Sequence, residues 1–517
     1  MPDVIVIGGG VAGLLAARQL AHLGNAVVVV EEKDALGGFV ARSTVAGVDL
    51  DSGAESFATR KGTVASLVTE LGLGADIVAP NPAGAWVQWD GGAAPLPAAG
   101  VLGIPGVPLA DDVRRIIGWG GALRAYLDRL MPLVRVRAET DLGDIVRRRM
   151  GRLVLERLVT PVVAGVHSAD PSVVDVHTVA PGLTQAMTTQ GSLSGAVMAL
   201  REMAPAGSQV QGIAGGMHRL IEALEADCRY YGVEFRTGAR VTAVSRRDKL
   251  RPGSAERLDA EISAARGQWI VEVEPVAGSV TGPDAAESFD ARAVVVATGF
   301  RPALGLLAQA GVEPGALAGE WPAPASVTVA TLVIDDARLD AHPRGTGVLV
   351  APGTPGVTAK ALTHSSAKWA WLGDSLPAGR HVVRLSYGRR GPDASAAAGR
   401  APAAGQSAGA ASGADEALVP DLATVVRDAS ALLGIPLSES DVAGFATTAW
   451  ADSLAFATVG HKARARQVLA AVDDVDGLDV VGAWVSGTGL AATVEQTRLT
   501  ASGLAAELRG APRLRPE

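Results

Sequence analysis

Apolar and polar positions near the start of the chain follow the order of a strand, a helix and a second strand. Residues 4–7 read Val-Ile-Val-Ile and residues 27–30 are four valines, so both runs predict buried parallel strands. Residues 14–23 carry apolar side chains at helical spacing, and Gly24 follows as a stop signal. The pattern therefore predicts a β-α-β unit within an α/β fold.

The same reasoning predicts the remaining elements. Short apolar runs predict strands at 86–89, 233–236, 241–245, 269–274, 289–299, 327–334 and 348–350. Amphipathic runs predict helices at 63–71, 111–117, 123–130, 142–158, 221–230 and 417–433. Polar stretches at 248–267 and 278–287 predict loops. Residues 392–415 are rich in Ala, Gly, Ser and Pro and cannot bury enough apolar surface to offset their ordering entropy, so we expect a disordered insertion.

A glycine-rich turn joins the first predicted strand to the first helix. It reads Gly8-Gly9-Gly10-Val11-Ala12-Gly13, a G-x-G-x-x-G. The first glycine allows a tight turn, the second lets a pyrophosphate approach the backbone, and the third lets the helix pack closely on the strand. The pyrophosphate would lie at the helix N-terminus, where free N–H groups and the helix dipole favour an anion.

Two carboxylates follow the second predicted strand. Glu31 lies 21 residues after Gly10, where an acid is expected to accept hydrogen bonds from a ribose hydroxyl, and Glu32 is the next candidate. A carboxylate there repels a 2′-phosphate, so NADP is not the expected ligand. The turn and the acids predict a dinucleotide site, and by themselves leave FAD and NAD open.

Length and composition narrow the class of protein. The chain has 517 residues, which is more than one core of about 250–300 residues accommodates, so at least two domains are expected. A net charge of −8 argues against nucleic acid as the main partner. A chain with a single cysteine, Cys228, cannot form an internal disulfide. The sequence has no cluster of Cys and His residues that would indicate a metal site. No signal peptide or membrane-spanning run is predicted, so we expect a cytoplasmic protein with at most peripheral membrane contact.

The predicted helical region has its own charge balance. Residues 111–157 hold eleven arginines, no lysine and seven acids, a balance of +4 in an acidic chain. Two interpretations remain open: the polar faces of a helical subdomain, or a basic surface that attracts a polyanionic substrate or an anionic membrane.

Motifs after the first acid select the cofactor. Leu36-Gly37-Gly38-Phe39 and then 49–56, Asp-Leu-Asp-Ser-Gly-Ala-Glu-Ser, follow Glu31. This order resembles the flavin-dependent amine oxidase and protoporphyrinogen oxidase superfamily. The resemblance implies FAD, with a set of residues beside or near the flavin: Gly38, Phe39, Gly53, Ala54, Glu55 and Ser56.

Later motifs narrow the resemblance to the coproporphyrinogen III and protoporphyrinogen oxidases, and they lie at 157–171, 345–350, 361–369 and 384–389. The segments 212–220 and 289–299 resemble features of the whole superfamily, and 447–450 and 482–490 complete the match. The resemblance implies further FAD contacts from Val241, Trp450, Thr488, Gly489 and Leu490. It also implies that the flavin carries the chemistry, and no catalytic side chain is predicted.

Three residues are candidates for contact with the substrate. Lys61 precedes a predicted helix and is either a solvated cation or a partner of substrate carboxylates. His167 is either a pocket residue or a structural histidine. Lys368 could bind substrate or simply end a strand.

The resemblance implies a discontinuous architecture. We expect a Rossmann-like FAD-binding domain from 1–88, 208–300 and 441–517, an inserted helical subdomain at 97–207 and a mixed-sheet substrate domain at 301–440.

The implied reaction is the oxygen-dependent oxidation of a porphyrinogen in haem biosynthesis, with loss of six electrons and formation of three H2O2. The lack of an anchor and the basic helical region favour coproporphyrinogen III, which has four propionates, over protoporphyrinogen IX, which has two. A flavin amine oxidase would be expected to need an aromatic cage, which a chain with 4% aromatic residues makes less favoured. A flavoprotein scaffold without turnover, and a partner such as a ferrochelatase, are left open.

Overall fold

The computed structural model describes most of the chain. The described residues are 1–132, 141–167, 169–203, 210–247, 267–318, 321, 325–388, 419–453, 457–487 and 489–511, without the side chains of Arg60, His167, Ala325 and 451–453. The expected insertion at 392–415 and the expected loop at 248–267, except Gly267, lie outside these ranges.

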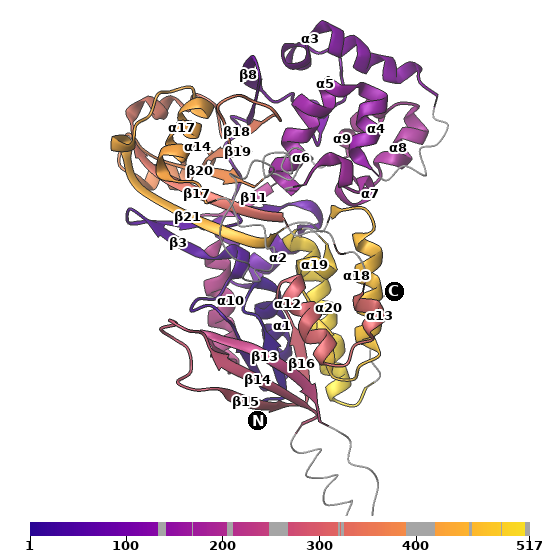
Figure 1. Cartoon of the computed structure of the whole chain (residues 1–517), viewed down its shortest axis with the longest axis vertical. Helices are drawn as coiled ribbons and strands as arrows, with labels where there is room; N and C mark the ends of the chain where they lie inside the picture. Colours follow the sequence, from indigo (N-terminus) through magenta and orange to yellow (C-terminus); the bar gives the residue numbers. More distant parts are fainter. Residues whose placement is uncertain are drawn as a thin grey trace, which may run out of the picture.

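A five-stranded parallel sheet forms the base of the molecule (Figure 1). Its strands, in spatial order, are β12 (Glu234–Arg236), β2 (Val27–Val30), β1 (Val4–Ile7), β16 (Ala293–Val296) and β22 (Leu478–Val480). Val4 pairs with Val27 on one side and with Ala293 on the other. The beginning, the middle and the end of the chain therefore meet in one sheet.

Alternate side chains of β1 enter two different cores, as the period of a strand requires. Val4 and Val6 pack in a cluster with α1 (Val11–His22), α10 (His218–Tyr230) and α20 (Leu490–Leu508). Ile5 and Ile7 pack in the cluster on the opposite face. That cluster includes α12 (Phe300–Gln309), α18 (His461–Asp473), α19 (Ala483–Ser486) and the antiparallel strands β13 (Ala239–Arg246), β14 (Trp269–Pro275) and β15 (Glu287–Ala291). Burial on both faces explains why the strand is apolar throughout.

A second, seven-stranded sheet lies beside the helical region in Figure 1. Its order is β21 (Val442–Ser453), β17 (Ala325–Asp335), β20 (Arg380–Tyr387), β19 (Ala361–His364), β18 (Gly347–Val350), β7 (Trp86–Trp89) and β8 (Gly92–Pro95). Neighbouring strands are antiparallel except β18 and β7, which are parallel. Helices α14 (Ser365–Lys368), α15 (Ala370–Ser375) and α17 (Leu422–Leu433) accompany it.

The pairing of two strands bears on the expected domain division. β7 pairs with β18, and β21 pairs with β17, so both belong to the seven-stranded sheet. The expected flavin ranges 1–88 and 441–517 therefore each include a strand of the other sheet. The division into domains stays a prediction.

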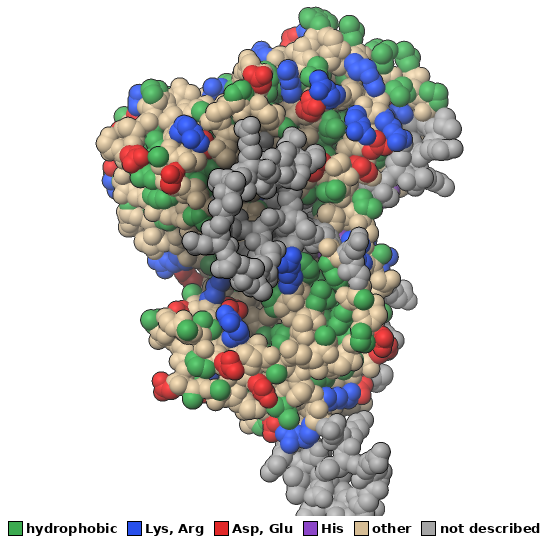
Figure 2. Space-filling model, in the orientation of Figure 1, with side chains coloured by type: hydrophobic (Ala, Val, Ile, Leu, Met, Phe, Trp, Pro, Cys, Tyr) green, Lys and Arg blue, Asp and Glu red, His purple; other side chains and the backbone are tan. Residues whose placement is uncertain are grey.

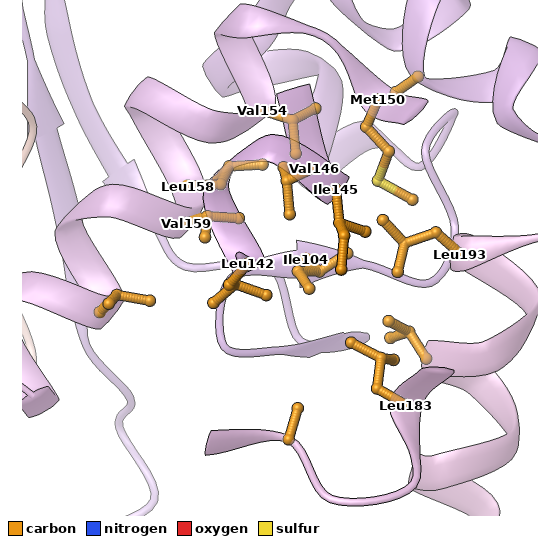
Figure 3. Packing of buried hydrophobic residues seen from close by; sticks show 14 of the residues in the cluster. Ile104, Leu142, Ile145, Val146, Met150, Val154, Leu158, Val159, Leu183 and Leu193 are labelled. Carbon is orange, nitrogen blue, oxygen red and sulfur yellow. The ribbon is translucent and has the colours of Figure 1, made fainter. Parts of the chain in front are cut away.

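The helical region forms a separate core at the upper end of Figure 1. Its helices are α3 (Asp111–Tyr126), α4 (Leu142–Met150), α5 (Arg152–Val154), α6 (Thr160–His167), α7 (Val176–Val179), α8 (Leu183–Gln190) and α9 (Leu193–Met203), and the 3₁₀ turn η4 (Leu127–Leu130) follows α3. Figure 3 shows Leu142, Ile145 and Leu158 meeting Ile104 and Leu193 in this core.

Smaller elements connect these parts. Two short sheets contain β5 (Phe57–Ala58), β11 (Val210–Ile213) and β6 (Ile77–Val78) in one and β3 (Arg42–Val45) with β4 (Val48–Asp51) in the other. The ribbon β9 (Gly100–Val101) and β10 (Ile104–Pro105), the helices α2 (Thr63–Glu70) and α13 (Pro314–Leu317), and the turns η1 (Gly38–Val40) and η2 (Arg60–Gly62) complete the connections used below.

Two sequence predictions of single elements were wrong. The expected strand 289–299 is two strands, β15 and β16, which lie in different sheets, because the chain turns at Arg292, where both Arg292 N and Ala293 N donate to the Asp3 carbonyl. The expected helix 142–158 breaks at Gly151, whose φ is 93°. An apolar run alone does not reveal either break.

Candidate functional site

The glycine-rich turn packs more tightly than any side chain would permit. A Cβ on Gly8 would lie 2.8 Å from the Ala297 carbonyl oxygen, and the φ of Gly8 is 108°. A Cβ on Gly13 would lie 1.8 Å from the Gly8 carbonyl oxygen. The turn therefore brings β1, the start of α1 and the end of β16 into direct backbone contact, as the motif predicted.

The N-terminus of α1 is open towards a ligand. Gly10 is the N-cap residue, and no side chain in the described ranges caps the helix. A Cβ on Gly10 would meet only the Cα of Gly38, at 4.0 Å, so an approaching group finds space there. Val11 and Ala12 open the helix directly after this residue. Uncapped amides with free approach fit the pyrophosphate of a dinucleotide.

Glu31 is held beside this turn at the end of β2. Its Oε2 accepts a hydrogen bond from Gly9 N at 2.7 Å, and its Oε1 accepts one from Lys33 N at 2.9 Å. Each carboxylate oxygen keeps acceptor capacity for a ribose hydroxyl. Glu32 instead pairs with Arg240 at the surface, at 2.5 Å. Val241 follows Arg240 in β13 and is partly buried against the core that also contains Ile5 and Ile7 of β1.

Further glycines gather at the same carboxyl edge of the sheet. Gly482 follows β22, and Gly489 is the N-cap residue of α20 with φ 103°. A Cβ on Gly489 would meet nothing within 4 Å. Leu490 begins α20 and packs against the cluster that holds α1, whereas Thr488 lies outside the described residues. Ligands of open α/β sheets bind at this edge, so the arrangement fits a nucleotide.

A loop after β4 lies between η1 and the seven-stranded sheet. A Cβ on Gly53 would lie 2.1 Å from the Phe39 carbonyl oxygen, and Ala54 N donates to that same oxygen at 2.9 Å. Trp450 of β21 donates through Nε1 to the Ser52 carbonyl at 3.1 Å, and its ring lies 5.0 Å from that of Phe39. The structure thus brings together Phe39, the loop and Trp450, which come from distant parts of the chain. Ser56 ends the loop before β5.

Glu55, in this loop, is a buried carboxylate with cationic partners. Arg384 Nη1 lies 2.8 Å from Oε1, Ser365 donates to Oε1 at 2.5 Å, and Lys368 Nζ lies 3.4 Å from Oε2. Arg384 also donates to the Gly53 carbonyl at 2.7 Å. Burial alone would raise the pKa of Glu55, but Arg384, Lys368 and Ser365 lower it to about 2. The carboxylate is therefore ionised and joins the loop to β20 and α14.

The three substrate candidates lie in different settings. Lys61 has a 65% exposed side chain and pairs with Glu495 of α20 at 3.0 Å. Lys368 is 20% exposed, and its ammonium is held beside Glu55. His167 ends α6, and its side chain is outside the described set.

The sequence analysis placed Arg384 and Ser365 within motifs but did not identify either as a site residue. Arg384 is buried in β20 between Val383 and Leu385, which are also buried. An arginine within an apolar strand is itself a signal, because a buried guanidinium needs a carboxylate partner.

A histidine pair adjoins this network. His364 Nε2 lies 3.2 Å from His381 Nδ1, and His381 Nε2 lies 2.9 Å from Asp340. Burial, with the neighbouring His381 and His342, lowers the pKa of His364 to about 3, so this ring is neutral. Among the described residues no group of His, Cys, Asp or Glu could hold a metal ion.

The fold and the glycine-rich turn fit a protein that binds a dinucleotide at the carboxyl edge of a parallel sheet. The family of flavin-containing amine oxidoreductases matches residues 11–334, and the chain belongs to this family. The predicted cofactor, FAD, is confirmed by this membership.

Comparison with individual proteins gives similarities that are more specific than the family. Coproporphyrinogen III oxidase of Mycobacterium leprae is 26% identical over 508 residues, which cover 97% of this chain and 98% of the relative. The enzyme of the same name from Mycobacterium tuberculosis H37Rv is 28% identical over 395 residues, covering 75% of this chain and 77% of the relative. A candidate protoporphyrinogen oxidase from Exiguobacterium sp. 255-15 has a similar crystal structure, with a TM-score of 0.76 at 23% identity and 98% coverage of both chains.

Proposed function

We propose that this protein oxidises coproporphyrinogen III to coproporphyrin III, with FAD as cofactor and O2 as electron acceptor, in haem biosynthesis. The observation that carries the proposal is the similarity, over almost the full length, to a relative named for this oxidation. Six electrons and six hydrogens leave the macrocycle, and three O2 become three H2O2, so the reaction balances.

The chain's own residues hold the cofactor in this proposal. Gly8 to Gly13 and the start of α1 take the pyrophosphate, Glu31 the ribose, and Val241 the adenine side. Phe39, the loop 53–56, Trp450 and the segment 488–490 surround the flavin ring. When bound, FAD accepts hydride from the substrate, and the protein supplies orientation and charge.

Two lysines are proposed to meet the substrate's propionates. The Lys368 ammonium is partly exposed and is oriented by Glu55 at 3.4 Å. Lys61 is exposed, and its pair with Glu495 is one that a propionate can replace at little cost, because exposed ion pairs contribute less than about 1 kcal/mol. His167 stays a candidate pocket residue.

The choice among substrates rests on charge and composition. Four propionates suit the basic helical region better than two, which favours coproporphyrinogen III over protoporphyrinogen IX. An amine oxidase would need an aromatic cage, for which a chain with 4% aromatic residues offers few side chains.

The proposal extends to organisation and partners. We keep the division into a discontinuous FAD-binding domain, a helical subdomain and a substrate domain, and a cytoplasmic location. A ferrochelatase is the class of enzyme that would accept the porphyrin product. Among the helices of the described ranges, none has the length and apolar character that crossing a membrane requires.

The test is porphyrin fluorescence appearing in air from each porphyrinogen, with purified, FAD-loaded protein. We expect faster oxidation of coproporphyrinogen III. Faster oxidation of protoporphyrinogen IX would replace the proposed substrate. Bound flavin with turnover of neither porphyrinogen would overturn the assigned reaction and leave an amine oxidase or a flavoprotein scaffold.

A further inference from the structure

The short helix α14 carries two of the groups that hold Glu55. Ser365, its first residue, donates to the Glu55 carboxylate at 2.5 Å, and the ammonium of Lys368, its last residue, lies 3.4 Å from the same carboxylate. His364 ends β19 and directly precedes the helix. The position of His364 therefore determines where α14 begins and where its polar side chains reach.

His364 is held by two further polar side chains. Its Nε2 lies 3.2 Å from Nδ1 of His381 in β20, and Nε2 of His381 lies 2.9 Å from a carboxylate oxygen of Asp340 in the 3₁₀ turn η8 (Ala337–Ala341). The two histidines are 1% and 5% exposed, whereas the surface around α17 carries charged side chains of both signs (Figure 2). We call Asp340, His381 and His364 the imidazole chain.

The hydrogen bonds of the imidazole chain have a direction. A carboxylate only accepts hydrogen bonds, so Nε2 of His381 carries the proton of its bond to Asp340. In a neutral His381 ring Nδ1 is then an acceptor, and Nε2 of His364 donates to it. Nδ1 of His364 is left without a proton, which agrees with its having no hydrogen-bond partner among the described residues.

A second proton on His381 would break this arrangement. Its Nδ1–H would then face the Nε2–H of His364, and two donors repel. To accept the new bond, His364 would have to carry its proton on Nδ1, where a buried N–H would lack a partner within the described part of the chain. The imidazole chain is therefore complete only while both rings are neutral.

Other groups act on the same two rings. Burial lowers the pKa of His381, and Asp340 and Asp336 oppose this effect. The ring of His342, at the end of η8, lies 5.5 Å from that of His364 and lowers the pKa of both buried histidines. The uncharged hydroxyl of Ser366, in α14, lies 3.5 Å from Nδ1 of His381. Asp340 is thus the group in hydrogen-bond contact that favours a proton on His381.

We propose that the imidazole chain positions α14, and with it the ammonium of Lys368, for binding of the substrate. Its members are positioning residues, because they act through the helix and take no part in hydride transfer. Acid weakens substrate binding when His381 gains a proton and the start of α14 is displaced. The inference rests on the proposed function, which assigns Lys368 to a propionate of the porphyrinogen.

The experiment compares Asp340→Asn with the original, FAD-loaded chain in the oxidation of coproporphyrinogen III from about pH 5 to about pH 8. The asparagine oxygen can still accept from His381, but the charge that favours a proton on that ring is gone. In the original chain we expect KM to rise several-fold towards pH 5, with kcat changing less than about twofold. In Asp340→Asn the rise should begin at a lower pH, which a purely structural role of Asp340 would not produce.

A second variant and a matched control accompany this comparison. His381→Phe keeps an aromatic ring and removes both nitrogens, so it should raise KM several-fold at pH 7 and reduce the further rise towards pH 5. Asp227→Asn is the control, because Asp227 makes a similar pair with His22, 3.1 Å from Nε2, between α10 and α1. It should leave the pH dependence of KM unchanged. Thermal unfolding at pH 7 shows whether each variant is folded.

The outcomes distinguish the two proposals. If the original chain oxidises coproporphyrinogen III but KM of Asp340→Asn rises at the same pH, the positioning role is wrong and the proposed reaction stands. An equal shift in Asp227→Asn also overturns the positioning role. If the original chain oxidises neither porphyrinogen, the reaction and this role both fall. Asp340→Asn decides the question even if His381→Phe does not fold.

Discussion

At the scale of single residues, Glu55 shows how a buried charge can be kept ionised. Its carboxylate has left water, and a guanidinium, an ammonium and a hydroxyl replace the lost solvation. The folded-state pKa of about 2 lies below the ordinary value of 4.5. Glu55 therefore adds stability that is fully present above pH 4.5 and is lost as the pH falls to about 2.

We expect Glu55→Gln to lower the free energy of unfolding at neutral pH by about 3 kcal/mol, because Arg384 and Lys368 keep their charges and lose their partner. The same variant should raise KM for the porphyrinogen more than it lowers kcat, since Lys368 is no longer oriented. Denaturant unfolding and steady-state kinetics measure the two effects.

The control for this prediction is Glu225→Gln. Glu225 pairs with Arg229 on the surface of α10 at 2.7 Å, so its loss should change stability by less than about 1 kcal/mol. Equal losses of unfolding free energy in Glu55→Gln and Glu225→Gln would mean that the buried ion pairs contribute no more to stability than an exposed one.

At the scale of elements, the loop 52–55 is held by two different parts of the fold. Its backbone bonds to Phe39 and Ala41, in and directly after η1, and to Trp450 and Arg384 of the seven-stranded sheet. A loop with partners on both sides moves little, which suits a segment that holds a ring in one orientation.

Gly53→Ala should displace this loop, because the added methyl would lie 2.1 Å from a backbone oxygen that cannot rotate away. We expect FAD content per chain, measured from visible absorbance, to fall several-fold. Gly305→Ala is the control: a Cβ there meets nothing within 4 Å, and alanine in α12 should be neutral or stabilising by about 1 kcal/mol. Full FAD content in Gly53→Ala would contradict a role of this loop in binding FAD.

The sequence predicted those features of the fold and site that depend on neighbouring residues in the chain. The turn from Gly8 to Gly13 needs glycine because backbones touch there, and such a requirement is written in consecutive residues. The partnership of Glu55 with Arg384 spans 329 positions and no period reveals it. Likewise the sequence of β21 does not say which sheet it joins, and only its pairing with β17 assigns it to the seven-stranded sheet.

At the scale of the whole molecule, the cofactor edge collects residues from strands β1, β2, β16 and β22, so ligand binding stabilises parts of the chain that are distant in sequence. FAD at about 100 times its Kd should add about 2.7 kcal/mol and raise Tm. NADP should give no such shift, because Glu31 repels a 2′-phosphate. Thermal unfolding with each nucleotide measures this, and an equal shift with NADP would contradict the role of Glu31.

The discontinuous parallel sheet also sets an order of events during synthesis. β1 leaves the ribosome almost three hundred residues before its neighbour β16, and β22 emerges later still. The glycine-rich turn therefore lacks its packing partner at Ala297 while almost three hundred residues are translated. We therefore expect FAD to bind late in synthesis, because a nascent chain that stalls before β16 lacks a complete FAD-binding site.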